Sequence, residues 1–291
     1  MPTIARLASR QLLSATIAAG ALLVGGAAWT QSGAQPAGKT DAAIPDFSSG
    51  DKTWMLMNGT AYLKADEPGP GPVVQRGKPY KHDVVPRIAE TNNPILKPWA
   101  KKLMDINNKR VIAGGLPFVT ASRCWPGGVP GILLYPGEPL VFLQSPEEVW
   151  IIGRDEQVRR IYMNVPHSKD PGYTNYGESV GHYEHGDTLV IDTIGLDDKG
   201  PIDRYRTPHT KQMHVVERYR VTNGGKNLEV LVDVEDPGTF TMPWKAKVDF
   251  ARGRGNSGTW KENVCSENTE DFFLDNRTDV VPEPQSDRRD F

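Results

Sequence analysis

The sequence is poor in cysteine, in net charge and in long apolar runs, and each shortage excludes a class of protein. Only two of the 291 residues are cysteines, too few for a structural zinc site or a disulfide-dense scaffold. Its 34 basic and 36 acidic residues leave a formal charge of −2. The sequence therefore lacks the net positive charge that is typical of proteins that bind nucleic acid or anionic lipid. Residues 12–28 are the one long apolar segment, and they are weaker than the roughly 20 strongly apolar residues of a spanning helix.

That apolar segment has the features of a secretory signal peptide. Arg6 and Arg10 precede it, and small residues near positions 26–34 suit a signal peptidase. We predict that residues 1–34 are removed and that the mature protein is periplasmic or secreted, without a membrane anchor. A retained N-terminal anchor is the alternative.

The mature chain divides into three parts by composition. Residues 35–138 carry many prolines and glycines and little alternation, so we expect them to wrap over a core formed elsewhere. A helix is predicted near residues 98–110, with Trp99, Leu103 and Ile106 at helical spacing. Residues 275–291 are charged and lack an apolar period, which predicts a mobile tail.

Residues 139–274 are rich in strand patterns. The predicted strands are 140–144, 149–153, 158–164, 179–184, 188–194, 214–221, 228–234, 244–250 and 259–265. Short turn segments join most of them, and no βαβ alternation is visible. The prediction is an all-β fold, an antiparallel meander that closes into a barrel-like (lipocalin-like) sheet able to hold a small ligand. A two-sheet sandwich is the alternative.

The region from Arg159 to Trp244 resembles a family of exported bacterial proteins of uncharacterised function. The family carries a G-x-S-x-G-x-W-x-G-D-T-L-V-V-D-T block, followed by P-H-S/T, H-V-x-E-R and D-P-x-x-Y-T-x-P-W. The corresponding segments here are GESVGHYEHGDTLVIDT, PHT, HVVERYRV and EDPGTFTMPW. Tyr183, His185 and Phe240 stand where the family usually has Trp, Gly and Tyr. The resemblance implies that this chain is a member of that family. Because the function of the family is uncharacterised, the resemblance implies no activity.

The block starting at Gly177 also fits the nucleophile-elbow string G-x-S-x-G, with Ser179 as the serine. That motif works on a turn from a strand into a helix, whereas a hairpin is predicted here. The two glycines are better interpreted as permitting a bend or a close backbone approach.

A metal site is a second possibility in the same region. His182 and Glu184 share a strand face, His185 lies at the turn, and His209 or His214 could complete a set of ligands. The spacing HYEH matches neither H-E-x-x-H nor H-x-x-E-H. We therefore predict no bound metal and no cofactor.

Acid–base chemistry is the preferred interpretation, because five of the six histidines fall between His167 and His214. Glu217 lies among apolar neighbours, where desolvation raises a carboxyl pKa, and its alternative role is a structural ion pair with an arginine such as Arg160. The residues predicted to converge as catalytic groups are His182, Asp192, His209, His214 and Glu217. Those predicted to contact substrate are Tyr162, Tyr183, Glu184, Tyr219 and Trp244.

Two classes of function follow from this pattern. The first is a periplasmic lyase, hydratase, isomerase or hydrolase that acts on an uncharged, partly apolar or sugar-derived compound. The second is a non-catalytic carrier that binds a small ligand in the same barrel. Titratable groups buried together favour catalysis, whereas an apolar interior with these groups outside favours binding. The partner is a small molecule in both cases, and the oligomeric state is left open.

The two cysteines are predicted to form a disulfide, because an exported chain meets oxidising conditions. A bond between Cys124 and Cys265 would stabilise the fold by about 2–4 kcal/mol and would join the N-terminal wrap to the last predicted strand. Thiol titration of denatured protein purified from the periplasm should find no free group. Two titratable thiols would contradict the pairing.

Overall fold

The structure is a computed structural model that describes residues 44–48, 53–57, 63–64, 88–89, 91–113, 120, 124–134, 139–153, 157–203 and 205–253. All of these fall within the segment Ala42–Phe291. The predicted signal peptide, the ninth predicted strand, Cys265 and the predicted tail lie outside the described residues. The disulfide therefore stays a prediction.

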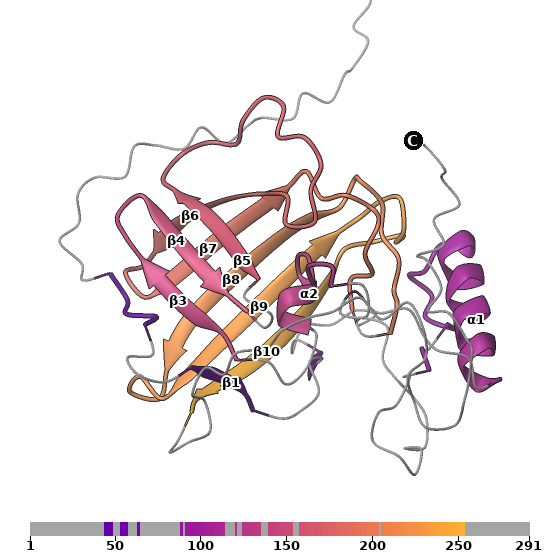
Figure 1. The fold of residues 1–291 in the computed structure, drawn as a ribbon, viewed down its shortest axis with the longest axis horizontal. Helices are drawn as coiled ribbons and strands as arrows, with labels where there is room; N and C mark the ends of the chain where they lie inside the picture. Colours follow the sequence, from indigo (N-terminus) through magenta and orange to yellow (C-terminus); the bar gives the residue numbers. More distant parts are fainter. Residues whose placement is uncertain are drawn as a thin grey trace, which may run out of the picture. The chain divides into compact units, whose positions relative to one another are not determined.

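A single barrel-shaped sheet dominates the described chain (Figure 1). Eight of the predicted strands are present, with every end within two residues of its expected position. The strands are β1 (Trp54–Leu56), β2 (Leu63–Lys64), β3 (Val141–Gln144), β4 (Glu148–Ile152), β5 (Val158–Met163), β6 (Glu178–Glu184), β7 (Thr188–Ile194), β8 (His214–Thr222), β9 (Asn227–Glu235) and β10 (Trp244–Arg252). The helices are α1 (Pro98–Ile112) and α2 (Gly131–Leu134).

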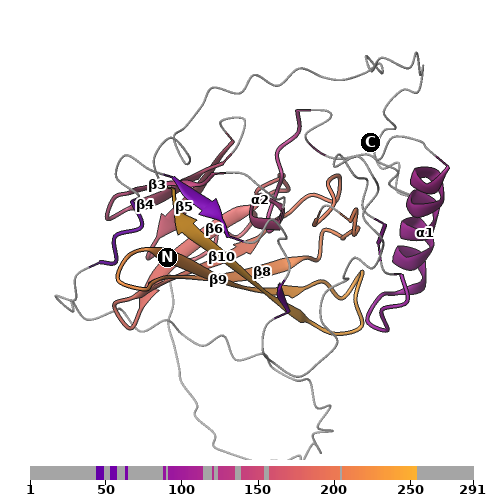
Figure 2. The ribbon, with the colours of Figure 1, turned by 90° about the horizontal axis from the view of Figure 1, so that it is seen from below.

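The sheet curls until its two ends almost meet. The strand order is β1-β10-β9-β8-β7-β6-β5-β4-β3, with β2 beside β10. Trp54 of β1 and Leu140, just before β3, exchange two backbone hydrogen bonds of 2.9 Å. Figure 2 shows β3 and β4 lying across the interior from β8 and β9. A barrel-like sheet, rather than a two-sheet sandwich, is therefore present.

Two features of the sheet differ from the prediction. β5 and β6 pair in parallel, so the meander is interrupted once, and residues 164–177 form a crossover between the two strands. A parallel pair needs such a connection, and the absence of a tight turn signal there is consistent with it. β1 and β2 also join the sheet from the segment predicted to be only a wrap. They are too short to show an alternation in the sequence.

The barrel interior is filled by the apolar face of each strand. Leu228, Val230, Val232 and Val234 of β9 are all fully buried, as their alternation predicts. Across the interior, the rings of Phe142 and Tyr219 meet edge to face with centroids 5.8 Å apart. This packing fixes which residues of every strand point inward.

Helix α1 is close to the predicted range, but the apolar residues at helical spacing, Trp99, Leu103 and Ile106, do not form its buried face. Ala100, Met104, Asn108 and Val111 are buried, whereas Ile106 is exposed. The side chain of Asn108 both donates to and accepts from the backbone of residue 89, at 2.9 Å each. A buried polar side chain with satisfied hydrogen bonds can replace an apolar one on the inner face, which sequence spacing alone does not reveal.

The glycines of the block at residues 177–181 serve close backbone approach, as the sequence predicted. Gly177 has φ +61°, and a Cβ there would lie 2.3 Å from the carbonyl oxygen of Ile194. We expect Gly177→Ala to lower the free energy of unfolding by at least about 2 kcal/mol, since a left-handed backbone and a clash both oppose it. Gly172→Ala is the matched control, because Gly172 has φ +67° and open space around it. Equal losses for the two variants in urea unfolding would refute the steric role of Gly177.

Candidate functional site

The barrel interior holds a fully buried ion pair. Nη2 of Arg159 on β5 lies 2.5 Å from Oε2 of Glu217 on β8, and both side chains are inaccessible to solvent. The guanidinium also donates to Ser179 Oγ (3.2 Å) and Thr193 Oγ1 (2.8 Å), and the Tyr219 hydroxyl donates to Glu217 Oε1 (3.1 Å). The network therefore joins four neighbouring strands, β5 to β8.

The alternation of β5 places Arg159 inside, on the same face as Ile161 and Met163. Burial is the largest single influence and acts to lower the pKa of the guanidinium, but Glu217 together with the nearby tyrosine hydroxyls raises the pKa overall. Nη1 of Arg159 has no hydrogen-bond partner among the residues that the structure describes, whereas Nε and Nη2 are both bonded. Glu217 is thus the partner of an arginine, as its alternative interpretation held, and the arginine is Arg159 rather than Arg160.

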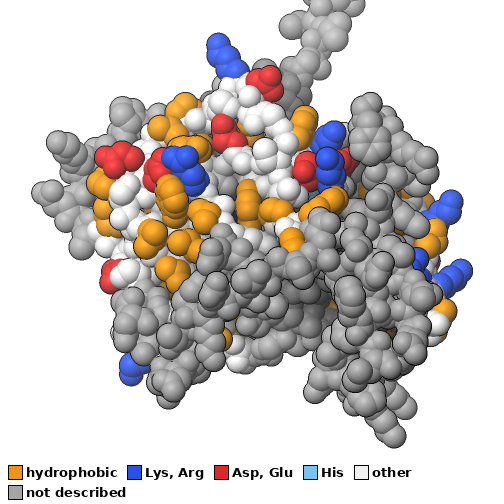
Figure 3. All heavy atoms as spheres, in the orientation of Figure 1, with side chains coloured by type: hydrophobic (Ala, Val, Ile, Leu, Met, Phe, Trp, Pro, Cys, Tyr) orange, Lys and Arg blue, Asp and Glu red, His pale blue; other side chains and the backbone are white. Residues whose placement is uncertain are grey.

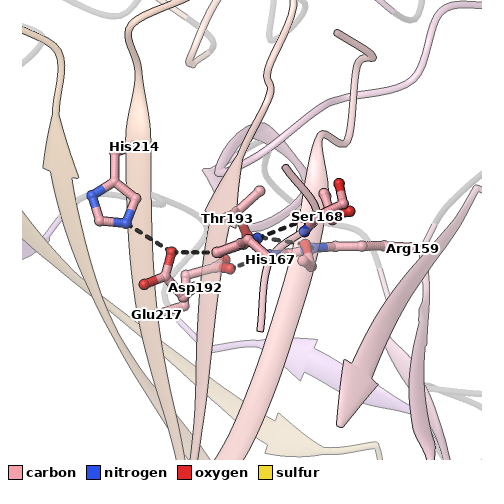
Figure 4. A network of polar contacts seen from close by, with 9 residues as sticks. Arg159, His167, Ser168, Asp192, Thr193, His214 and Glu217 are labelled. Carbon is pink, nitrogen blue, oxygen red and sulfur yellow. Dashed lines mark hydrogen bonds and ion pairs between the residues drawn. The ribbon is translucent and has the colours of Figure 1, made fainter. Parts of the chain in front are cut away.

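A second polar cluster lies on the outer face of β6, β7 and β8 (Figure 4). Asp192 Oδ1 is 2.7 Å from Nε2 of His214 and 3.1 Å from Nε2 of His167. The other ring nitrogen of His167, Nδ1, is 3.0 Å from Glu178 Oε1. Four side chains are therefore linked in the order Glu178, His167, Asp192, His214, and all four are partly exposed.

The carboxylates of this cluster stay ionised. Partial burial acts to raise the pKa of Asp192, but hydrogen bonds from His214 and His167 lower it overall. Glu178 behaves likewise: burial opposes ionisation, and hydrogen bonds from Ser168 and His167 lower the pKa. Ionised carboxylates only accept hydrogen bonds, so each ring nitrogen of His167 faces an acceptor oxygen.

His214 is the more accessible of the two imidazoles in the cluster. Its hydrogen bond to Asp192 raises its pKa above the ordinary value, although partial burial opposes the shift. Because Nε2 donates to Asp192, the neutral ring carries its lone pair on Nδ1. No hydrogen bond of Nδ1 to another residue is found in the described part of the chain. The geometry resembles the aspartate–histidine half of a catalytic triad, which accepts a proton at the free nitrogen.

The five residues predicted to be catalytic do not converge, and that prediction is wrong. In the register of β7 with β8, Ile191 lies opposite Glu217 and Asp192 lies opposite Val216. Neighbouring positions on a strand face opposite ways, so Glu217 points inward and Asp192 outward. Of the five, only Asp192 and His214 are in direct contact.

The other two predicted histidines have separate surroundings. His182 is exposed and pairs with Glu184 two residues away, at 3.2 Å. His209 is buried, its Nδ1 lies 3.3 Å from the carbonyl oxygen of Thr210, and burial lowers its pKa. Neither contacts Asp192 or His214.

The residues predicted to contact substrate are also divided between the two faces. Tyr183, Tyr219 and Trp244 point into the barrel, where Tyr183 Oη accepts from Gln144 (3.1 Å) and Trp244 packs against Phe240. Glu184 is on the outer face with His182.

Tyr162 lies on the outer surface of β5. The guanidinium of Arg160 stacks between its ring (5.2 Å) and that of Trp150 (5.3 Å), and pairs with Glu148. Apolar, basic and acidic side chains gather over β3 to β5 in Figure 3. Tyr162 is therefore part of a surface stack, separate from both polar networks.

Ser179 is not placed as a nucleophile. Ser179 is buried within strand β6, not on a turn from a strand into a helix. Its hydroxyl lies 3.0 Å from that of Thr193 and accepts a hydrogen bond from Arg159. No group of three or more His, Cys, Asp or Glu residues in the described ranges is arranged to hold a metal ion.

Three residues of the two polar networks were not predicted from the sequence: Arg159, His167 and Glu178. Arg159 could have been found, because it alternates with Ile161 and Met163 on the apolar face of its strand. His167 belongs to the noted histidine cluster, but its contacts depend on the parallel crossover. Glu178 lies in the G-x-S-x-G block, a motif that assigns a role to the serine and none to the residue before it.

The interior pair is expected to be structural. Glu217→Gln should lower the free energy of unfolding by about 3–5 kcal/mol, because it leaves the buried guanidinium of Arg159 uncompensated. The control is Glu148→Gln, which removes the solvent-screened partner of Arg160 and should leave the free energy of unfolding nearly unchanged. Chemical denaturation of both variants measures the difference. A loss for Glu217→Gln no larger than the control's would show that the ion pair is not structural.

The chain matches no protein-family model and no curated protein. None of the helices in the described ranges is long and apolar enough to cross a membrane. A functional conclusion therefore depends on the geometry of the two polar networks.

Proposed function

We propose that the protein is an exported enzyme that transfers protons on a small uncharged molecule, with His214 as the general base. The observation that carries this proposal is the Asp192–His214 contact at 2.7 Å, with Nδ1 of the imidazole left open. Asp192 orients the ring and stabilises its protonated form. The same nitrogen acts as general acid once it holds the proton.

The surroundings of Asp192 favour a partly apolar substrate. Its cross-strand neighbours on the outer face are Val180 and Val216, both half-exposed. A sugar derivative or a similar uncharged compound could lie on these valines with its acidic hydrogen near His214. The reaction class is that of a lyase, hydratase, isomerase or hydrolase.

Export is part of the same proposal. The signal-peptide pattern of residues 1–34 and the resemblance to an exported family both support a periplasmic or secreted protein. Side chains alone suffice for the proposed chemistry.

A second candidate is a carrier that binds a small ligand inside the barrel. It is favoured by the separation of the titratable groups between two faces and by Nη1 of Arg159, a buried donor that has no acceptor in the described part of the chain. A ligand carbonyl or carboxylate is the group that such a donor would bind.

The test compares wild type, His214→Gln and His182→Gln in a metabolite extract of the source cells. The extract is incubated in water enriched in deuterium and ¹⁸O and analysed by mass spectrometry. We expect wild type to convert or label a compound, His214→Gln to lose about 10²–10⁴-fold of that rate, and His182→Gln to keep it. Undiminished conversion by His214→Gln would exclude His214 as the base. No conversion by wild type, with a ligand retained in native mass spectrometry, would instead support the carrier.

A further inference from the structure

Tyr162 lies in the same row of the sheet as the outer cluster. The register sets Tyr162 of β5 against Val180 of β6, and Val180 against Asp192 of β7. On the far side of Asp192 the row continues to Val216 of β8. Residues paired across neighbouring strands point to the same face, and this row faces outward. The aromatic stack around Tyr162 and the Asp192–His214 pair are therefore parts of one surface.

This row is short enough for one small molecule to cover. Neighbouring strands lie about 4.8 Å apart, so Tyr162 and Asp192, on strands two positions apart, are separated by roughly 10 Å. Val180 lies between them and is half-exposed. A ligand of that length would contact the aromatic ring with one end and the dyad with the other.

The charges of the aromatic stack are balanced within it. Nε1 of Trp150 donates to Glu148 Oε2 (2.7 Å), and Nη2 of Arg160 lies 2.5 Å from the other oxygen of that carboxylate. The same contacts hold the guanidinium against the rings of Trp150 and Tyr162. Tyr162 nevertheless keeps 39% of its surface exposed. Because the pair of charges is already neutral, an uncharged ligand fits this surface better than a charged one.

A sugar ring has the chemistry that matches this surface. One side of the ring presents C–H groups, which pack on aromatic side chains, and its edge carries hydroxyl groups. The half-exposed guanidinium of Arg160 offers donors to those hydroxyls, and the carboxylate of Glu148 offers acceptors. A purely apolar compound would cover these polar groups without bonding them, which is unfavourable.

We propose that Tyr162, Trp150 and Arg160 form a subsite for the sugar ring of a neutral glycoside, whose apolar aglycone extends over Val180 toward the outer cluster. The proposal rests on the proposed function, because it describes the substrate of that same site. The sugar ring lies away from the reacting atoms, so its contacts hold and orient the substrate rather than take part in proton transfer.

The experiment titrates the purified protein with hexyl β-D-glucopyranoside and follows the aromatic ring resonances of Tyr162 and His214 by NMR. Two matched probes are methyl β-D-glucopyranoside, which lacks the apolar aglycone, and 1-hexanol, which lacks the sugar. We expect the hexyl glucoside to shift both resonances with one dissociation constant, and the methyl glucoside to shift Tyr162 more than His214. Because 1-hexanol cannot use the subsite, it should bind at least about tenfold more weakly than the hexyl glucoside.

Two variants at exposed positions test the subsite directly. Tyr162→Ala should weaken binding of the hexyl glucoside about tenfold, as expected for the loss of one stacked ring, with the His214 resonance as the readout. Leu231→Ala is the matched control. Leu231 lies on the outer face of β9, four strands from Tyr162, and is exposed to the same extent, 38% against 39%. This variant should bind as wild type does.

Equal losses in the two variants, no shift by the hexyl glucoside, or equal affinity for 1-hexanol would overturn the subsite. A shift of Tyr162 without a shift of His214 would overturn the extension toward the outer cluster. The titration measures binding without turnover, whereas the comparison of wild type with His214→Gln measures the base. Failure of the subsite and failure of the proposed function are therefore distinguishable.

Discussion

The alternation of side chains along a β-strand is the constraint on which the rest of this structure depends. In β7 and β8, each inward residue is followed by an outward one, and the register sets Ile191 against Glu217 and Asp192 against Val216. The same two strands therefore contribute a carboxylate to the interior and another to the outer surface. A shift of one residue in either strand would exchange these roles and expose the apolar face. The register is fixed because the inward positions of β9 and β10 are fully apolar.

The interior ion pair lies where the sheet departs from a simple meander. Arg159 comes from β5 and donates to Ser179 of β6, across the parallel pair, before it reaches Thr193 and Glu217. Desolvation of the two charges offsets most of the attraction between them, so the pair adds little net stability. Removal of one partner is strongly destabilising, because it leaves the other charge buried and unpaired. Such a network opposes any other pairing of β5 with β6, because a shifted register would leave the guanidinium without its acceptors. We infer that it specifies the register at this junction.

Local patterns in the sequence predicted the strands well and the site poorly, and one physical reason explains both. Apolar alternation and turn residues determine each strand locally, so β9 and the hairpin after β6 were predicted closely. The site depends on which face of a strand is inward, and the alternation of β7 does not reveal this, because Val190 on the same outward face as Asp192 is itself buried. His167 depends on a contact with Asp192 25 residues away, made possible by a parallel crossover that no local pattern shows. Arg159 was visible in principle, because its strand alternates cleanly.

The partial exposure of the outer cluster limits the kind of chemistry it can support. Asp192 and His214 keep 39% and 38% of their side-chain surface open, so water screens the attraction between them. A general base in such a place gains strength only when a substrate displaces that water. Val180 and Val216 beside Asp192 provide apolar contacts for a molecule that does so. A substrate that covers the dyad with its own apolar surface would therefore strengthen the Asp192–His214 interaction at the moment of proton transfer, whereas a small hydrophilic molecule would leave it screened.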